Sequence, residues 1–203
     1  MSQSEPEPRF LSRPVYGNLV ARDALMSVMI ADTPGADAIA SLAKSGPPAL
    51  LSKAHIIHLT SVAGSEGASA LKGLEPESYE EFSTTEAVLE RFEQLLGSAR
   101  MGIQIYLAGS EGLIGRAMQV ALNAGIEAGA VQCEHRGSLA RRVQCVHCKG
   151  FTENVKTQPV TCSHCGLLLL VRDHYSRRLA AFQGVCINAE DRSEMPQTEE
   201  AFQ

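Results

Sequence analysis

Apolar residues occur along this chain in four short runs, separated by longer segments with helical periodicity. The runs are nearly continuous rather than alternating, which is typical of strands buried on both faces of a sheet. Because strands and helices alternate, the pattern predicts a Rossmann-like α/β fold with a parallel sheet covered by helices. The predicted strands are residues 25–30, 54–59, 103–107 and 130–134.

The segments between these strands carry the end signals of helices. Pro34 fits the first position of a helix that stops at the Ser-Gly-Pro-Pro of residues 45–48. The Ser-Thr-Thr-Glu of residues 83–86 is a capping box, and it opens a second helix that ends at Gly97. A third helix is expected up to residue 123. Three helices therefore accompany the four strands.

Composition divides the chain into parts with different expected order. The stretch from residue 60 to 82 is rich in Gly, Ser and Glu and is predicted to be a long loop. These shifts predict four parts. Residues 1–14 are expected to be disordered, and residues 15–135 to form an α/β domain that opens with a short strand at 15–20. Residues 136–185 are expected to form a cysteine ribbon with a docking segment, and residues 186–203 a flexible acidic tail.

The composition predicts an aliphatic core and no membrane span. Hydrophobic residues make up 44% of the 203 residues, Trp is absent and aromatic residues are only 5%. The N-terminus has no apolar segment resembling a signal peptide. The longest apolar run, residues 166–171, is far shorter than the about 20 residues needed to cross a bilayer. We expect a cytoplasmic protein with no membrane partner.

Charge is distributed unevenly. Residues 1–135 carry nine Lys or Arg against sixteen Asp or Glu, whereas residues 136–180 carry eight basic residues against two acidic ones. A basic ribbon between acidic segments can bind nucleic acid, steer an acidic protein partner, or lie on its own acidic domain. A protein partner or internal docking is favoured, because the net charge of −5 opposes binding to phosphate.

Four cysteines form the strongest motif. Two Cys-x-x-Cys pairs, separated by thirteen residues, have the spacing of a structural zinc ribbon, with mononuclear iron as the main competitor. Gly150 and Gly166 follow the pairs where such turns tend to need a positive φ. His147 and His164 lie inside the turns and are not assigned as ligands. The predicted ligands are Cys145, Cys148, Cys162 and Cys165, which leaves Cys133 and Cys186 without a role.

A second candidate site lies where the third strand meets its helix. Ligands of open parallel sheets sit at the carboxyl ends of the strands, so Gly109 and Ser110 are candidate cofactor-binding residues. The alternative is that the glycine only permits a tight turn. At the end of the first strand, Asp32 would oppose a pyrophosphate resting on the following helix.

Residues 24–135 resemble the NAD(P)-binding module of ferredoxin-reductase-type flavoenzymes. The likeness rests on Tyr106-Leu107-Ala108-Gly109-Ser110, on Gly125-Ile126 and on a final strand that closes on Glu134. The glycine-rich phosphate loop of that family is replaced here by Asp32-Thr33-Pro34-Gly35. The resemblance therefore implies a reductase-like fold that has lost dinucleotide binding, and a working NAD(P)-binding reductase module remains an alternative.

The cysteine ribbon and the run that follows it resemble the small accessory subunit family of bacterial dimethylamine monooxygenase. The run is Asp173-His174-Tyr175-Ser176-Arg177-Arg178-Leu179. The resemblance implies a subunit of an NAD(P)H- and O₂-dependent enzyme that demethylates a secondary amine. Haem, flavin and an iron–sulfur cluster would then belong to the partners, a haem oxygenase chain and a flavin/iron–sulfur reductase chain.

The residues agree with a subunit that is not catalytic on its own. The sequence suggests no Ser/His/Asp or Cys/His pair, and a four-thiolate zinc site has no open position for water. Arg and Tyr are enriched at protein interfaces, so the polar cluster after the ribbon is a candidate partner surface. It comprises Asp173, His174, Tyr175, Arg177 and Arg178. A zinc-ribbon nucleic-acid-binding or translation-associated factor is the alternative hypothesis, motivated by the basic ribbon.

Overall fold

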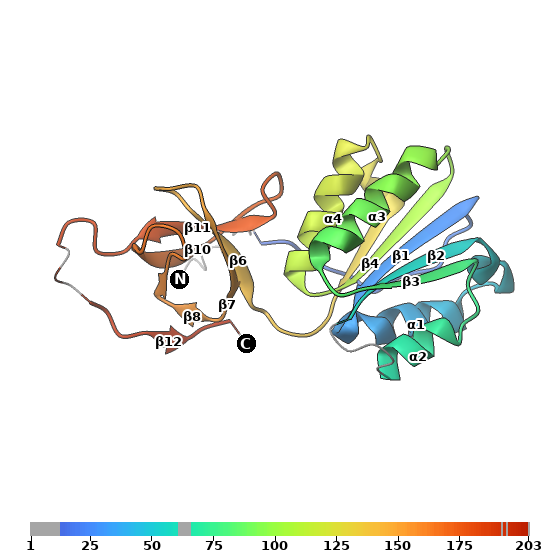
Figure 1. The fold of residues 1–203 in the computed structure, drawn as a ribbon, viewed down its shortest axis with the longest axis horizontal. Coiled ribbons are helices and arrows are strands. Elements are labelled where there is room, and N and C mark those ends of the chain that lie inside the picture. Colours follow the sequence, from blue (N-terminus) through green and yellow to red (C-terminus); the bar gives the residue numbers. More distant parts are fainter. Residues whose placement is uncertain (1–12, 61–65, 192, 194, 203) are drawn as a thin grey trace, which may run out of the picture.

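The computed structural model describes residues 13–60, 66–191, 193 and 195–202. A helical α/β unit and a smaller unit of strands lie side by side along the long axis (Figure 1). The predicted disorder of residues 1–14 falls almost wholly outside the described residues. Within the described residues, no helix has the length and apolarity that crossing a bilayer requires.

The first unit is built on a fully parallel five-stranded sheet. Its order is β3-β2-β1-β4-β5, so the chain starts in the middle of the sheet, winds to one edge and then crosses to the other. The two central strands, β1 and β4, are buried except at their first residues, which explains their continuous apolar runs. The strands are β1 (Met26–Asp32), β2 (Ala54–Leu59), β3 (Ser78–Phe82), β4 (Ile103–Gly109) and β5 (Val131–His135).

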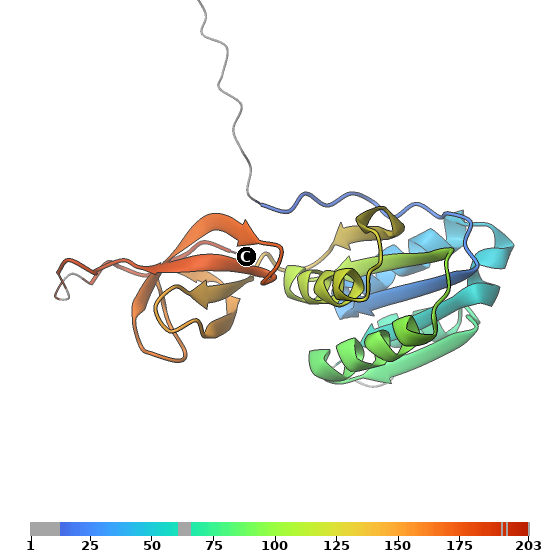
Figure 2. The same ribbon diagram turned by 90° about the horizontal axis from the view of Figure 1, so that it is seen from above.

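Helices cover both faces of this sheet, which confirms the predicted α/β class (Figures 1 and 2). The helices α1 (Ala36–Ser45) and α2 (Glu66–Lys72) pack on one face over an aliphatic cluster around Met29 and Ile39. The helices α3 (Thr85–Ser98) and α4 (Glu111–Asn123) pack on the other, around Ile30 and Phe92. Short 3₁₀ turns complete the unit: η1 (Thr33–Gly35), η2 (Pro48–Lys53) and η3 (Ala128–Ala130).

The prediction of a long loop at 60–82 is wrong for most of the residues that the structure describes there, because α2 and β3 lie within this range. The strand β3 is an edge strand whose residues are only half-buried or exposed, so its polar Ser-Tyr-Glu-Glu sequence lacks the apolar run of a central strand. The predicted strand at 15–20 is also wrong. That segment is extended but outside the sheet, with the amide of Gly17 donating to the carbonyl of Cys133.

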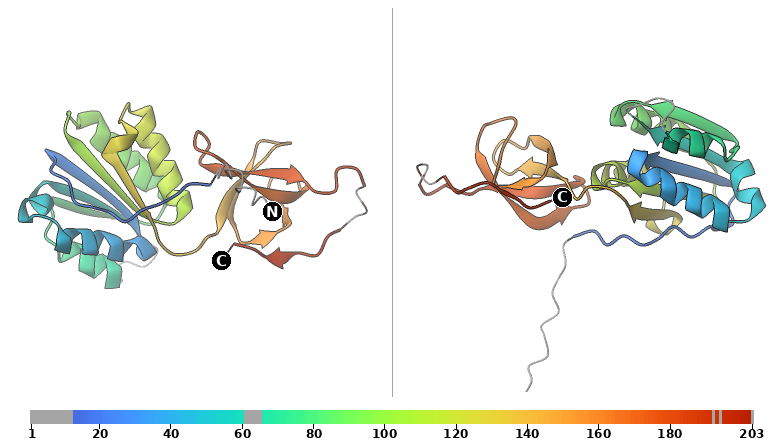
Figure 3. Two further views of the ribbon diagram at one scale, coloured as in Figure 1. Left: turned by 180° about the vertical axis from the view of Figure 1, so that it is seen from behind. Right: turned by 90° about the horizontal axis from the view of Figure 1, so that it is seen from below.

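The second unit is a five-stranded sheet of order β7-β6-β11-β10-β9. The strands β6 and β11 pair in parallel and the others pair antiparallel. Figure 3 shows the chain leaving this sheet at its far end and returning beside it. The strands of this sheet are β6 (Arg141–Cys145), β7 (Phe151–Val155), β9 (Val160–Thr161), β10 (Leu168–Ser176) and β11 (Ala181–Cys186). The short strand β8 (Thr157–Gln158) lies outside it.

The acidic tail is not free along its whole length, contrary to the prediction. Its strand β12 (Glu199–Glu200) pairs antiparallel with β8. Just beyond it, the ring of Phe202 lies with its centroid 4.0 Å from the guanidinium carbon of Arg141. The paired segment is too polar and too short to be predicted as a strand from sequence. Its pairing with β8 and the cation–π contact of Phe202 hold it against the second unit.

The two units meet where α4 touches the hairpin of β10 and β11. Gly115 of α4 leaves room for this contact, because a β-carbon there would overlap the Tyr175 hydroxyl and lie 3.0 Å from the β-carbon of Ala180. The side chain of Gln119 donates to the carbonyl of Arg178. Much of the docking segment that was predicted after the cysteine ribbon therefore packs against α4 of the same chain.

Glu111 is a half-buried acid at this junction. Burial raises the pKa of its carboxyl group, although Arg141 and a hydrogen bond from Tyr16 oppose the shift. One of its oxygens is buried with no hydrogen-bond partner among the described residues. A group with a raised pKa favours folding while it is protonated, and this contribution is lost as the pH rises through the folded-state pKa.

Glu111→Gln is therefore expected to stabilise the protein. A neutral amide has no charge to desolvate, so we expect the melting temperature to rise by roughly 2–4 °C at pH 8. The gain should shrink at pH 5, where the wild-type carboxyl group is more protonated. Differential scanning calorimetry at both pH values measures this. A gain that does not depend on pH would contradict the raised pKa.

Candidate metal centre

Two turns bring the four predicted cysteines together. Cys145 ends β6 and Cys148 lies in the turn behind it, while Cys162 follows β9 and Cys165 lies in the second turn. All four sulfur atoms lie within 4.8 Å of one another. Across the pairs, the Sγ atoms of Cys145 and Cys165 are 3.8 Å apart and those of Cys148 and Cys162 are 3.7 Å apart.

These distances fit a tetrahedral metal ion. Zinc–thiolate bonds of about 2.3 Å in tetrahedral geometry separate the sulfurs by about 3.8 Å. Backbone amides support the thiolate form, since the amide of Gly150 donates to the sulfur of Cys148 over 3.4 Å. Burial opposes ionisation of Cys162, but the amides of Cys165 and His164, together with the thiols of Cys165 and Cys148, outweigh it and lower the pKa of its thiol to about 6. The four cysteines can hold a metal.

The glycines of the two turns have different roles, which corrects the expectation. Gly166 has the predicted positive φ, +72°, but in the first turn it is Lys149 that has a positive φ, of 64°. Gly150 is needed for space, because a β-carbon there would overlap the ring of His164. That ring hydrogen-bonds through Nε2 to the carbonyl of Phe151 over 2.9 Å, which leaves His164 outside the ligand set.

The carboxyl ends of β1 and β4 form the second predicted site, and Asp32 fills it. One carboxylate oxygen of Asp32 accepts from the amide of Gly35 over 3.0 Å, and the other accepts from the amide of Ser110 over 2.8 Å. Gly109 has a φ of +129°, and a β-carbon there would overlap the carboxylate. The amides of Gly35 and Ser110, which could cradle a phosphate, are thus occupied by the chain's own acid.

Glu134 at the end of β5 is also used internally. One of its oxygens accepts from the amide of Leu19 over 2.8 Å, and the other accepts from Nε of Arg136 over 2.8 Å. The residue that matches the closing Glu of the reductase module therefore anchors the N-terminal segment to the sheet.

Comparison with known proteins identifies the family. The model described as "Dimethylamine monooxygenase subunit DmmA-like, N-terminal domain" matches residues 8–131, and the corresponding C-terminal domain model matches residues 142–185. The chain belongs to the DmmA-like family of dimethylamine monooxygenase subunits. The predicted accessory-subunit family is confirmed.

Individual known proteins are also similar to parts of this chain. The chain is similar to the "Heme-dependent oxidative N-demethylase delta subunit" of Ectopseudomonas mendocina (strain ymp), with 35% identity over 95 residues. That match covers 47% of this chain and about half, 54%, of the relative. Among solved structures, a ferredoxin reductase in carbazole 1,9a-dioxygenase (FAD apo form) matches with a TM-score of 0.41 and 15% identity, covering 61% of this chain and 34% of the other.

In this DmmA-like chain, the predicted partner residues split into two groups. Asp173 and Tyr175 are engaged within the chain: Asp173, although exposed, accepts from Nη2 of Arg141 over 2.6 Å, and the half-buried Tyr175 ring packs edge-on against Phe182 at 5.1 Å between centroids. His174, Arg177 and Arg178 form the second group, and all three are exposed. The structure therefore does not bring the five together as one outward-facing cluster.

Sequence reasoning missed the residues that join the two units. Arg141 is only 6% exposed and lies 4.0 Å from the ring centroids of both Phe182 and Phe202. Its partners, like those of Glu111, lie tens of residues away along the chain. The only sequence signal is the basic pair Arg141-Arg142 before the first cysteine, and it does not name a partner.

Proposed function

We propose that this chain is a zinc-binding, non-catalytic subunit of a multi-subunit, NAD(P)H- and O₂-dependent dimethylamine monooxygenase in the cytoplasm. Zn²⁺ would be held by Cys145, Cys148, Cys162 and Cys165. The chain would organise the haem oxygenase chain and the flavin/iron–sulfur reductase chain of the complex. Membership of the DmmA-like family is the observation that carries this proposal.

Two features support a non-catalytic role. Four thiolates complete the tetrahedral coordination of zinc, so such a site has no position for water or substrate and serves folding. The reductase-like sheet in turn has Asp32 bonded to the amides of Gly35 and Ser110, where a pyrophosphate would need them. On this proposal, amine oxidation and hydride transfer take place on other chains of the complex.

The geometry favours the protein-partner hypothesis over a nucleic-acid-binding factor. Three of the eight basic residues of 136–180 are paired with acids: Arg136 with Glu134, Arg141 with Asp173, and Arg142 with Glu153. The ring of Phe151 lies under Arg142, 4.0 Å from its guanidinium carbon, and is not free to stack on a base. These pairings reduce the positive field that phosphate binding requires.

Native purification tests the proposed function. A tagged copy of the chain, expressed in its own host and captured gently, should retain chains that carry haem and flavin, seen as a Soret band and flavin fluorescence. The chain purified alone should be colourless, contain one zinc ion and show no NAD(P)H oxidation. Recovery of a lone chain from the native host, with no haem or flavin retained, would contradict the proposal.

A further inference from the structure

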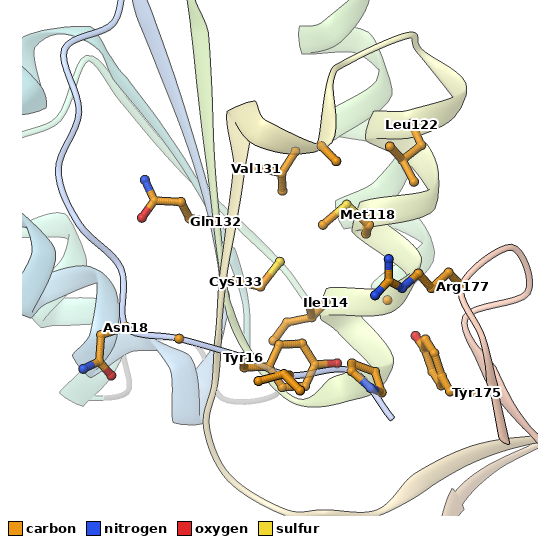
Figure 4. Close-up of a pocket in the computed structure, with 15 residues that line it drawn as sticks. Tyr16, Asn18, Ile114, Met118, Leu122, Val131, Gln132, Cys133, Tyr175 and Arg177 are labelled. Carbon is orange, nitrogen blue, oxygen red and sulfur yellow. The ribbon is translucent and has the colours of Figure 1, made fainter. Parts of the chain in front are cut away.

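A groove lies beside the junction of the two units (Figure 4). Its walls are the extended segment at 14–18, the strand β5, the helix α4 and the hairpin of β10 and β11, and its volume is about 420 Å³. We call it the α4 groove, and its lining includes six apolar or aromatic residues. They are Tyr16, Ile114, Met118, Leu122, Val131 and Tyr175.

The α4 groove has an apolar floor and a single charged residue. Ile114 is buried at its base, while Leu122 stands 43% exposed at its rim. Among the described residues that line it, Arg177 alone is charged. Arg177 is exposed and forms no ion pair with any described residue.

Two further polar side chains that line the groove, those of Gln132 and Tyr16, are already engaged within the chain. The side-chain amide of Gln132 accepts from the backbone amide of Val20 and donates to its carbonyl, both over 2.8 Å. The hydroxyl of Tyr16 hydrogen-bonds to Glu111. A small polar ligand needs several converging polar groups to fix its orientation, whereas the lining of this groove is mainly apolar and Arg177 is its one charged residue. An apolar side chain with a neighbouring carboxylate matches the apolar floor of the groove and the guanidinium of Arg177.

We propose that the α4 groove binds a protein segment of a partner subunit that presents an apolar side chain next to Asp or Glu. The apolar side chain would lie on Ile114 and Met118, between Tyr16 and Tyr175, and the carboxylate would pair with Arg177. Aromatic residues and arginine around an apolar pocket are the common composition of interface hot spots. This inference rests on the proposed function, because the segment is assigned to a haem- or flavin-bearing chain of the complex.

Two substitutions test the groove without touching the cysteine ligands. Leu122→Glu places a carboxylate on its rim and Arg177→Glu reverses its one charge. Each should lower the haem or flavin retained on the tagged chain about tenfold or more, with metal content and melting temperature unchanged. The matched control is Met101→Glu, at a side chain that is 94% exposed and precedes β4, away from the groove. It should retain the wild-type amount.

The chemistry of the occupant is tested by a photo-crosslinking amino acid in place of Leu122, with Met101 as the control position. Mass spectrometry of the cross-linked peptide should find an apolar residue beside Asp or Glu in a haem- or flavin-bearing chain. A cross-link to a second copy of this chain, to its own N-terminal peptide or to a basic segment would overturn the inference. Equal retention by wild type and both groove variants would overturn it while leaving the proposed function standing. No retention even by wild type would contradict the proposed function itself.

Discussion

Cys162→Ser is expected to release the metal and unfold the cysteine ribbon while the α/β unit stays folded. Cys162 is 2% exposed and lies within the ribbon's apolar cluster, beside Val143 and Leu169. Metal binding at such sites provides folding free energy on the order of 10 kcal/mol, far more than this small sheet can supply from its own core. Hydrogen exchange should show lost protection in β6, β7, β10 and β11 and native protection in β1 and β4.

The matched control is Cys186→Ser, at a cysteine that lies in the same sheet but outside the group of four candidate ligands. Its thiol contacts the side-chain oxygen of Asn188 over 3.5 Å, a contact that a hydroxyl can replace. Metal content should stay at the wild-type level. Full metal content in Cys162→Ser would mean that the four sulfurs are not the ligand set.

Gly35→Ala is expected to destabilise the α/β unit strongly. A β-carbon at residue 35 would overlap the backbone carbonyl of Ala108 and lie 2.8 Å from the amide nitrogen of Gly109. Backbone of a central strand cannot move aside, so α1 would have to shift away from β4. We expect a loss of about 3 kcal/mol or more and a fall in melting temperature of roughly 10 °C, measured by thermal denaturation.

Gly112→Ala provides the control for this substitution. Gly112 lies in α4, and no atom lies within 4 Å of the position its β-carbon would take. Alanine in a helix is favoured over glycine by about 1 kcal/mol, so this variant should be neutral or slightly more stable. Equal melting temperatures for the two variants would show that the close approach of α1 to β4 is not required.

The sequence was sufficient to predict the layers of the α/β unit. Its central strands are buried on both faces, so their apolar runs are strong signals, and the predicted strand at 54–59 coincides with β2. The edge strand β3 gave no such signal because solvent reaches it. Glu80 on β3 is held by Arg91 of α3, which donates to it over 2.9 Å, and such a pairing is not visible in sequence.

The candidate sites were predictable to different degrees. The spacing within each Cys-x-x-Cys pair is a local feature, because one tight turn places both of its thiols. The sequence was therefore sufficient to predict which thiols lie together. Gly109 and Ser110 lie at the carboxyl end of a strand as expected, but the acid bonded to the Ser110 amide is Asp32, on the neighbouring strand. The partner residues depend on how the hairpin lies on α4. That arrangement requires the space that Gly115 leaves for Tyr175, and the two residues are sixty positions apart in the chain.

X-ray absorption spectroscopy of the purified chain, combined with elemental analysis, tests the central claim most directly. The account predicts one zinc ion per chain with four sulfur neighbours at about 2.3 Å and no nitrogen or oxygen ligand. A substoichiometric metal, or a first shell containing nitrogen or oxygen, would contradict it.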